Sequence, residues 1–380
     1  MPLYPRYPRY PGTPGIPILP VPPIPPVSRY SRYPRYSRYP RYPDTPGTPG
    51  PTPQPRSPGR DAVPALPAVP RRRSGFMAGR GAARVAARVG QGANSAGKGR
   101  QLGPEAALRL LEASVVHREG ALLALSKPTA LPVLGRSGEL SLTALLPALR
   151  RRLGLPAELH VVKAPARECS GLVLLSACHR VTEQLQRSFS AARRRGHFPA
   201  TYSAVTVGIP AEAEGEIHAG LCWQQKGDTA VVVAVPSPGR RSLARGEVKS
   251  TRTRYRLLGA AGGCALLQLQ PRTAFPEQLQ VHLTLLLCPA LGDHRHASRV
   301  GKVLGEPFLL PPQETPTPHT QVLDAELMSR LQLSPHQRLP LHLHLQQLVL
   351  PHTVLCAPPP PHFLRTLRLL GLPSPPLPVH

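Results

Sequence analysis

From about residue 105 onward, apolar and polar residues follow patterns that predict a compact domain. Apolar residues three and four positions apart predict helices over 105–113, 142–153 and 182–195. Short apolar or alternating runs predict strands over 121–125, 172–175, 201–207, 251–258, 264–270 and 341–345. Because these elements do not alternate regularly, we expect an α+β domain with a mixed, largely antiparallel sheet and flanking helices.

The last of these runs, 341–345, places two histidines on one face of a strand. His342 and His344 are two residues apart, so both side chains point the same way. They could bind a metal together, but no third ligand is near them in the sequence. We therefore interpret them as part of a half-exposed strand face and expect no metal site.

Residues 1–70 have a different composition. They contain 23 of the 52 prolines and eight of the ten tyrosines, in repeats of Tyr, Pro and Arg. Proline fixes φ and cannot donate a backbone hydrogen bond, so we expect a disordered Pro/Arg/Tyr-rich tail with polyproline II character. It is an accessory tail, or translated repeat DNA upstream of the true start of the gene. Two functional alternatives are RNA contact through Arg and Tyr, and binding of SH3-like partners.

The segment 71–104 is basic and contains no acidic residue, since none occurs between Asp61 and Glu105. Three of its arginines lie four residues apart and would form one cationic stripe on a helix: Arg80, Arg84 and Arg88. This pattern is typical of a mitochondrial transit peptide. We hypothesise that translation begins at Met77 and that the protein is imported into the mitochondrial matrix. The alternative is an ordinary basic linker.

Charge and cysteine content narrow the class of protein. The chain carries a net charge of +27, of which residues 1–104 contribute +15 and the remainder +12. A folded part this basic attracts phosphate polyanions, so RNA is the expected partner. The six cysteines form no Cys-x-x-Cys pair, which argues against a zinc site. No run of about 18 apolar residues occurs, so we expect no membrane span.

We expect one domain over 105–355, followed by a Pro-rich segment over 356–380.

Four segments carry motifs in a fixed order. They contain Lys127-Pro128, then Ser170-Gly171 before an apolar strand, then Tyr202-Ser-Ala-Val-Thr-Val-Gly208, and finally Gln278-Leu279 with a downstream Pro-x-x-Gly-Asp293. Together, over about residues 115–350, they resemble the RluA family of RNA pseudouridine synthases. The resemblance implies a pseudouridine-synthase-like domain that binds RNA and isomerises uridine without a cofactor or a metal.

The same resemblance shows which catalytic groups this chain lacks. The family's nucleophilic Asp falls on Ala166, and the Arg that pairs with it falls on Gln280. The family's active-site Tyr is retained as Tyr202. Because a methyl group can neither attack a sugar nor take a proton, the site is chemically impaired unless another acid enters it. Glu168 is the nearest candidate, with Glu277 on the opposing segment; alternatively, Glu168 is a surface carboxylate paired with a neighbouring arginine.

Two hypotheses therefore remain. The favoured one is an RNA-binding member of the family that supports mitochondrial RNA or ribosome maturation, together with other mitochondrial RNA-processing proteins. The alternative is an active isomerase that forms pseudouridine in mitochondrial mRNA or rRNA with a substitute acid. For either, the cationic residues expected along an RNA cleft are Lys127, Lys163, Arg167, Arg193, Arg194, Arg195, Lys249, Arg252 and Arg254.

Overall fold

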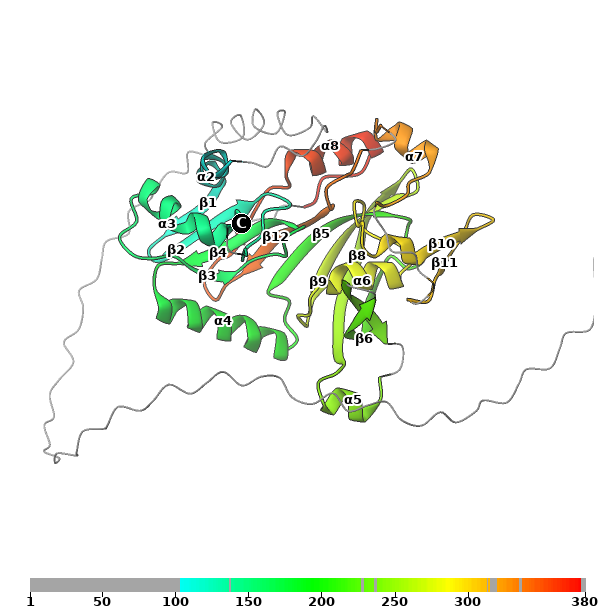
Figure 1. The fold of residues 1–380 in the computed structure, drawn as a ribbon, viewed down its shortest axis with the longest axis horizontal. Helices are drawn as coiled ribbons and strands as arrows, with labels where there is room; N and C mark the ends of the chain where they lie inside the picture. Colours follow the sequence, from blue (N-terminus) through cyan, green and yellow to red (C-terminus); the bar gives the residue numbers. More distant parts are fainter. Residues whose placement is uncertain are drawn as a thin grey trace, which may run out of the picture. The chain divides into compact units, whose positions relative to one another are not determined.

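The computed structural model describes residues 103–376, except 137, 227–228, 236–237, 313, 315–319 and 335–336. Within this part of the chain, one sheet of eleven strands forms the framework (Figure 1). The predicted tail over 1–70 and nearly all of the predicted transit peptide lie outside the described residues. No helix among the described residues has the length and the apolar content needed to cross a membrane.

The sheet is mixed and largely antiparallel, as predicted. Its strands lie in the order β1 (Val115–Glu119), β2 (Leu122–Lys127), β4 (Ser170–Ser176), β12 (Leu343–Val349), β5 (Ala200–Val207), β9 (Cys264–Pro271), β8 (Lys249–Ala261), β6 (Glu214–Lys226) and β7 (Thr229–Val235). Two further strands pair with β4 and β12, namely β3 (His160–Lys163) and β13 (Val354–Cys356). Of the strand pairs in the described part, only β12 with β4 is parallel.

Helices cover both faces of the half of the sheet that contains β4. Helices α2 (Pro104–Ala113) and α3 (Leu142–Arg152) pack on Val173 and Leu175 of β4. Helix α4 (His179–Arg194) packs on the other face, where Leu172 and Leu174 belong to the same apolar cluster as its Leu185 and Phe189. All seven residues of β4 are buried, because this strand lies between two helical layers (Figure 1).

The other half of the sheet carries the remaining helices. Helix α6 (Gln278–Leu285) packs on β6 and β7, while α7 (Ala325–Arg330) and α8 (Pro361–Leu370) cover β5 and β9. The shorter elements of this half are α5 (Arg240–Ala244), the 3₁₀ helix η1 (Ala297–Arg299) and a separate hairpin of β10 (Val300–Val303) and β11 (Glu306–Leu309).

The segment expected only to be Pro-rich contains a packed helix. Helix α8 begins at Pro361, and proline fits the first helical position because its missing N–H would have no partner there. Its side chains Phe363, Leu367 and Leu370 are buried against the sheet. Residues after 355 therefore complete the core of the domain.

The prediction of a half-exposed histidine face on the late strand is wrong. His342 and His344 are 1% and 0% exposed. The hydroxyl of Ser170 lies 2.9 Å from Nδ1 of His344, and Thr366 of α8 lies 2.8 Å from Nε2 of His342. Both faces of the strand are covered, since α8 packs where the sequence pattern suggested solvent. Burial lowers the pKa of each histidine to about 4, so both are neutral members of the core.

Candidate functional site

A pocket of about 170 Å³ lies where the loop before β4 meets the first residues of β5 and the N-terminal end of α6. Ala166 and Cys169 line it from the loop, Tyr202 from β5, and Gln280 from α6. The structure thus brings together Ala166, Tyr202 and Gln280, the three positions that the family resemblance placed in one site. Ala166 and Gln280 are 114 residues apart in the chain. Parallel pairing of β12 with β4, and its antiparallel pairing with β5, bring the loop and the tyrosine side by side.

Lys127 supports the loop from inside the protein. Its ammonium donates hydrogen bonds to the carbonyls of Pro128 and Leu131, both at 2.9 Å, and to that of Arg167 at 3.0 Å. The side chain is 1% exposed, and burial lowers its pKa to about 8. The prediction that Lys127 contacts RNA is therefore corrected: it ties the loop to the end of β2.

Gly171 allows the loop to enter the sheet at this point. Its φ of +117° is a conformation that residues with a side chain rarely adopt. A Cβ atom here would overlap the backbone of Leu345 in β12. Position 171 of the Ser170-Gly171 motif must therefore be glycine, because the backbones of β4 and β12 approach too closely there for any larger residue.

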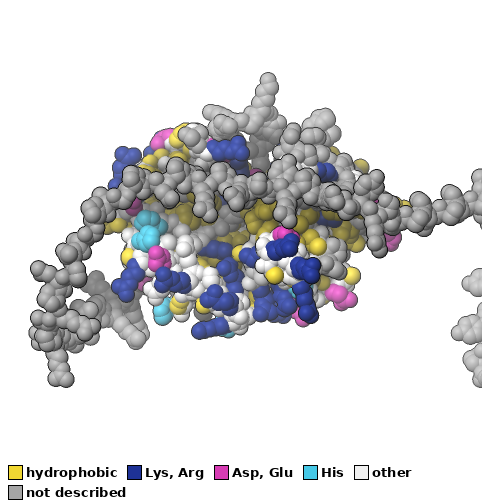
Figure 2. All heavy atoms as spheres, turned by 60° about the horizontal axis from the view of Figure 1, so that its bottom comes forward, with side chains coloured by type: hydrophobic (Ala, Val, Ile, Leu, Met, Phe, Trp, Pro, Cys, Tyr) yellow, Lys and Arg dark blue, Asp and Glu magenta, His cyan; other side chains and the backbone are white. Residues whose placement is uncertain are grey.

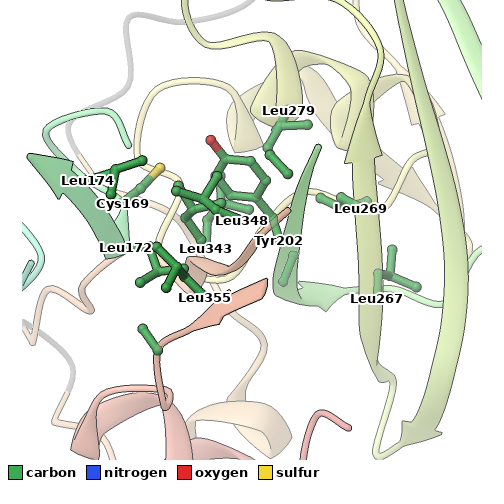
Figure 3. Close-up of a cluster of buried hydrophobic side chains, with 14 of the residues drawn as sticks. Cys169, Leu172, Leu174, Tyr202, Leu267, Leu269, Leu279, Leu343, Leu348 and Leu355 are labelled. Atoms are coloured by element: carbon green, nitrogen blue, oxygen red, sulfur yellow. The ribbon is translucent and has the colours of Figure 1, made fainter. Parts of the chain in front are cut away.

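Tyr202 forms the floor of the pocket. Its ring lies among Cys169, Leu343 and Leu279 (Figure 3). Burial raises the pKa of the phenol far above its usual value, with a smaller contribution from Cys169. The thiol of Cys169 is also buried, which raises its pKa to about 12. Both groups stay protonated near neutral pH, so the tyrosine can hold a base or donate a hydrogen bond but is a poor proton acceptor.

The loop that carries Ala166 places no carboxylate in the pocket. Glu168 does not line the pocket; its carboxylate is more than half exposed and lies 3.6 Å from Nε of Arg167. Arg167 also forms a salt bridge of 2.8 Å with Glu139. This geometry matches the interpretation of Glu168 as a surface carboxylate, and it places Arg167 among acids outside the pocket.

Among the residues that line the pocket, Glu277 is the one carboxylate. It precedes α6 with a φ of +54°, and its side chain is 15% exposed. One oxygen pairs with Arg295, and the other lies 2.9 Å from Nε2 of His296. Burial alone would raise its pKa, but these two partners outweigh burial and lower it. Glu277 is therefore an ionised carboxylate whose two oxygens both have partners.

The side chain of Gln280 faces a second buried acid, Asp293. Its side-chain nitrogen lies 3.5 Å from Oδ1 of Asp293, at the limit of a hydrogen bond. The same oxygen accepts the backbone N–H groups of Arg295 and His296. Asp293 is 1% exposed, and its Oδ2 has no partner among the described residues. The carboxylate thus holds the turn after Gly292 and does not itself line the pocket.

Besides Lys127 and Arg167, the predicted RNA-binding cations divide into three groups. Lys163 and Arg193 line the pocket, where burial, and secondly the charge of Arg193, lowers the pKa of Lys163. Arg194 and Arg195 are exposed at the end of α4, on a side of the protein where Lys and Arg gather (Figure 2). The third group comprises Lys249, Arg252 and Arg254.

The third group lies on β8 and does not line the pocket. Thr253 faces α6, since its hydroxyl lies 2.9 Å from Nδ1 of His282. Successive side chains of a strand point to opposite faces, so Arg252 and Arg254 point away from α6. Arg254 pairs with Glu214 at 3.4 Å, and Lys249 is exposed at the first residue of the strand. The expectation that this group shares the cleft with Lys163 is corrected.

Sequence reasoning missed the partners of Glu277. Arg295 and His296 follow the Gly-Asp293 motif after one intervening residue, His294, and the tight turn at Gly292 brings them back to the start of α6. The position of Glu277 directly before the Gln278-Leu279 motif could have suggested nearby cations, because a half-buried carboxylate needs them. In the described part of the chain, no three His, Cys, Asp or Glu side chains gather in a metal-binding cluster.

Comparison with known proteins gives a consistent result. Residues 121–285 match the family model described as RNA pseudouridylate synthase. The chain is 50% identical to "Mitochondrial mRNA pseudouridine synthase Rpusd3" of Mus musculus, over 71% of this chain and 81% of that protein. It is 35% identical to "Pseudouridylate synthase RPUSD4, mitochondrial" of Xenopus tropicalis, over 71% and 84%. The solved structure "Human RNA Pseudouridylate Synthase Domain Containing 4" is 26% identical, with a TM-score of 0.57 over 72% of this chain and 98% of that one.

Proposed function

Because this chain belongs to the RNA pseudouridylate synthase family, we propose that it binds mitochondrial RNA in this pocket without isomerising it. In this role it supports the maturation of mitochondrial RNA or ribosomes together with other RNA-processing proteins. The relatives named as mitochondrial support this location, and the matrix is the compartment that holds such RNA.

One observation carries the proposal: the pocket that Ala166, Tyr202 and Gln280 line has no carboxylate without a partner. Ala166 offers a methyl group at the nucleophile position, and both oxygens of Glu277 are paired. Removal of a catalytic nucleophile costs about a millionfold in rate in other enzymes. Gln280 likewise replaces a guanidinium by a neutral amide. Loss of both members of the pair avoids a buried arginine without its carboxylate.

RNA binding needs none of the lost groups. Lys163 and Arg193 supply positive charge at the pocket, and Tyr202 supplies an aromatic surface for a base. Positive charge alone gives RNA affinity that falls as salt rises. A uridine turned out of its strand would therefore be held by stacking and charge, while its glycosidic bond stays intact.

Glu277 supports the alternative of an active isomerase. It lines the same pocket, is ionised, and stands on the wall opposite Ala166. To act as the substitute acid it would have to give up a pairing with Arg295 or His296 when RNA binds. That exchange costs free energy, because a half-buried carboxylate would lose a charged hydrogen bond.

The test combines two measurements on the full-length protein. Fluorescence anisotropy of labelled mitochondrial mRNA and rRNA fragments measures binding, and chemical mapping of the same RNA after incubation measures pseudouridine. We expect salt-dependent binding without pseudouridine. Product that forms with the wild type and disappears with Glu277→Gln would replace the proposal by the isomerase, whereas Glu168→Gln serves as the matched control outside the pocket. Absence of RNA binding would refute both functions.

A further inference from the structure

An exposed tryptophan stands next to the pocket. Trp223 lies on β6, is 51% exposed, and pairs across the hairpin with Val232 of β7. It is the one tryptophan of the whole chain. Among the described residues, Trp223 and Phe308 are the aromatic side chains found among the exposed large apolar residues. Phe308 lies on the separate β10–β11 hairpin, so Trp223 alone of the two belongs to the sheet that carries the pocket.

Phe275 joins this tryptophan to the pocket. Its ring lines the pocket, and the centroids of the Phe275 and Trp223 rings are 6.4 Å apart at an angle of 41°. Phe275 also belongs to a small apolar cluster with Leu221 and Val232, which fixes the hairpin against Val281 of α6. The two rings therefore form one continuous surface that begins inside the pocket and ends in solvent.

Positive charge lies beside these rings. Arg295 donates a hydrogen bond of 3.1 Å to the carbonyl of Ala230. Ala230 pairs with Gln225, two residues along β6 from Trp223. Lys163 and Arg193 line the pocket itself. An RNA phosphate at the pocket thus meets Lys163 and Arg193, and a strand that follows the rings outward passes Arg295, whose charge is already paired with Glu277.

We propose that Trp223 and Phe275 form a stacking shelf for an unpaired base of single-stranded RNA, adjacent to the nucleotide that enters the pocket. This inference rests on the proposed RNA-binding function and names the form of RNA that the site selects. Aromatic side chains beside a cationic groove hold successive bases because every base offers a π-face. A paired strand cannot use the shelf, since its bases are already stacked on one another.

The single tryptophan makes the shelf directly observable. Excitation at the red edge of the tryptophan band, where tyrosine does not absorb, reports on Trp223 alone in the full-length protein. We expect a single-stranded oligouridine to quench this emission with the same midpoint as the anisotropy of the labelled strand. Inorganic polyphosphate, which carries charge but no bases, and the same strand annealed to its complement should leave the emission unchanged.

Substitutions separate stacking from charge. We expect Trp223→Ala to weaken binding of the single strand by about fivefold to about a hundredfold, the loss typical of one base–aromatic contact. Trp223→Phe should keep most of the affinity, and Phe275→Leu should weaken binding as Trp223→Ala does. Phe308→Ala is the matched control, an exposed aromatic ring on another sheet, and should bind as the wild type does. Urea unfolding of each variant checks that the fold is retained.

Two results would overturn the inference, and they differ in what they leave standing. In the first, RNA binds Trp223→Ala as tightly as the wild type and does not quench the emission of the wild type. This result would refute the stacking shelf but would leave the RNA-binding function standing. RNA that does not bind the wild type at all removes both.

Discussion

The ammonium of Lys127 donates a hydrogen bond of 3.0 Å to the backbone carbonyl of Arg167, the residue that follows Ala166. This contact joins two of the four motifs that mark the family. It spans 40 positions of the chain and holds the loop that carries Ala166. A buried ammonium thus keeps this loop in place against the end of β2.

We expect Lys127→Met to destabilise the protein and to disorder the loop. Three carbonyl oxygens would lose their common donor inside the protein, which costs about 3 kcal/mol in the free energy of unfolding. Urea denaturation followed by circular dichroism measures this loss. The control is Lys302→Met, because Lys302 is an exposed lysine 3.9 Å from Asp324 and its loss should cost less than about 0.5 kcal/mol. If Lys127→Met and Lys302→Met lost the same amount of unfolding free energy, then the hydrogen bonds from Lys127 would not stabilise the loop.

The cations that line the pocket should control RNA affinity. We expect Lys163→Gln and Arg193→Gln each to weaken RNA binding and to reduce the slope of log Kd against log salt by about 1. Arg254→Gln removes the same charge from the opposite side of the sheet, where Glu214 already pairs with it, and should leave the slope unchanged. Titrations of labelled RNA at several salt concentrations measure the slopes. A uniform loss in all three variants would show that net charge, and not the pocket, governs binding.

If Ala166 and Gln280 occupy the family's Asp and Arg positions, as we propose, then introducing both groups should produce more activity than introducing either one. Ala166→Asp returns a carboxylate to the pocket, but without a guanidinium at position 280 nothing orients it. We expect Ala166→Asp/Gln280→Arg to form pseudouridine at a rate about tenfold above the value that the two single changes predict together. Mapping of pseudouridine in a bound RNA measures the product. If all variants bind RNA and none forms product, then the pocket has diverged beyond this pair.

The buried histidines should make the protein sensitive to acid. Burial lowers the pKa of His344 to about 4 from an ordinary 6.5. Between these two pH values, His344 is therefore protonated in the unfolded chain and neutral in the folded protein. Stability therefore falls as pH falls through this window, by about 1.4 kcal/mol per pH unit for each such histidine. Urea unfolding at neutral pH and near pH 5 measures the slope.

A non-titrating variant isolates the contribution of one histidine. His344→Gln should be less stable at neutral pH, because the contact with Ser170 changes, but its stability should depend less steeply on pH. His352→Gln, which alters an exposed histidine, is the control and should keep the wild-type slope. An unchanged slope in His344→Gln would refute the assignment.

Local pattern predicted much of the framework. The run Leu172–Leu175 predicts a strand because it is apolar without a polar interruption, and the structure has a strand there, β4, that is buried over its whole length. The class of sheet followed from the order of such runs. The burial of His344 could not be predicted in the same way, since it depends on α8, whose residues lie after a run of prolines. Distant packing overrides the alternating pattern at that strand.

Only those residues of the candidate site that belong to recognised motifs could be predicted from the sequence. Ala166, Tyr202 and Gln280 were placed together by resemblance to a family, and they line one pocket. Lys127 was misassigned because sequence shows a cation without showing whether it faces solvent. Trp223 carried no motif, and its nearness to Phe275 depends on how the β6–β7 hairpin packs on α6.

Strand β12 has a consequence for how the molecule is made. It lies between β4 and β5, yet it is synthesised more than 130 residues after β5 ends. While a nascent chain emerges, β5 and the part of β4 that β3 does not pair present open edges, which are templates for mispairing. Pairing across such sequence distances is also slow, because the chain must lose the entropy of closing a long loop before the stabilising contacts form. The pocket can therefore form only near the end of translation or after it, and the emerging chain needs protection from aggregation until then.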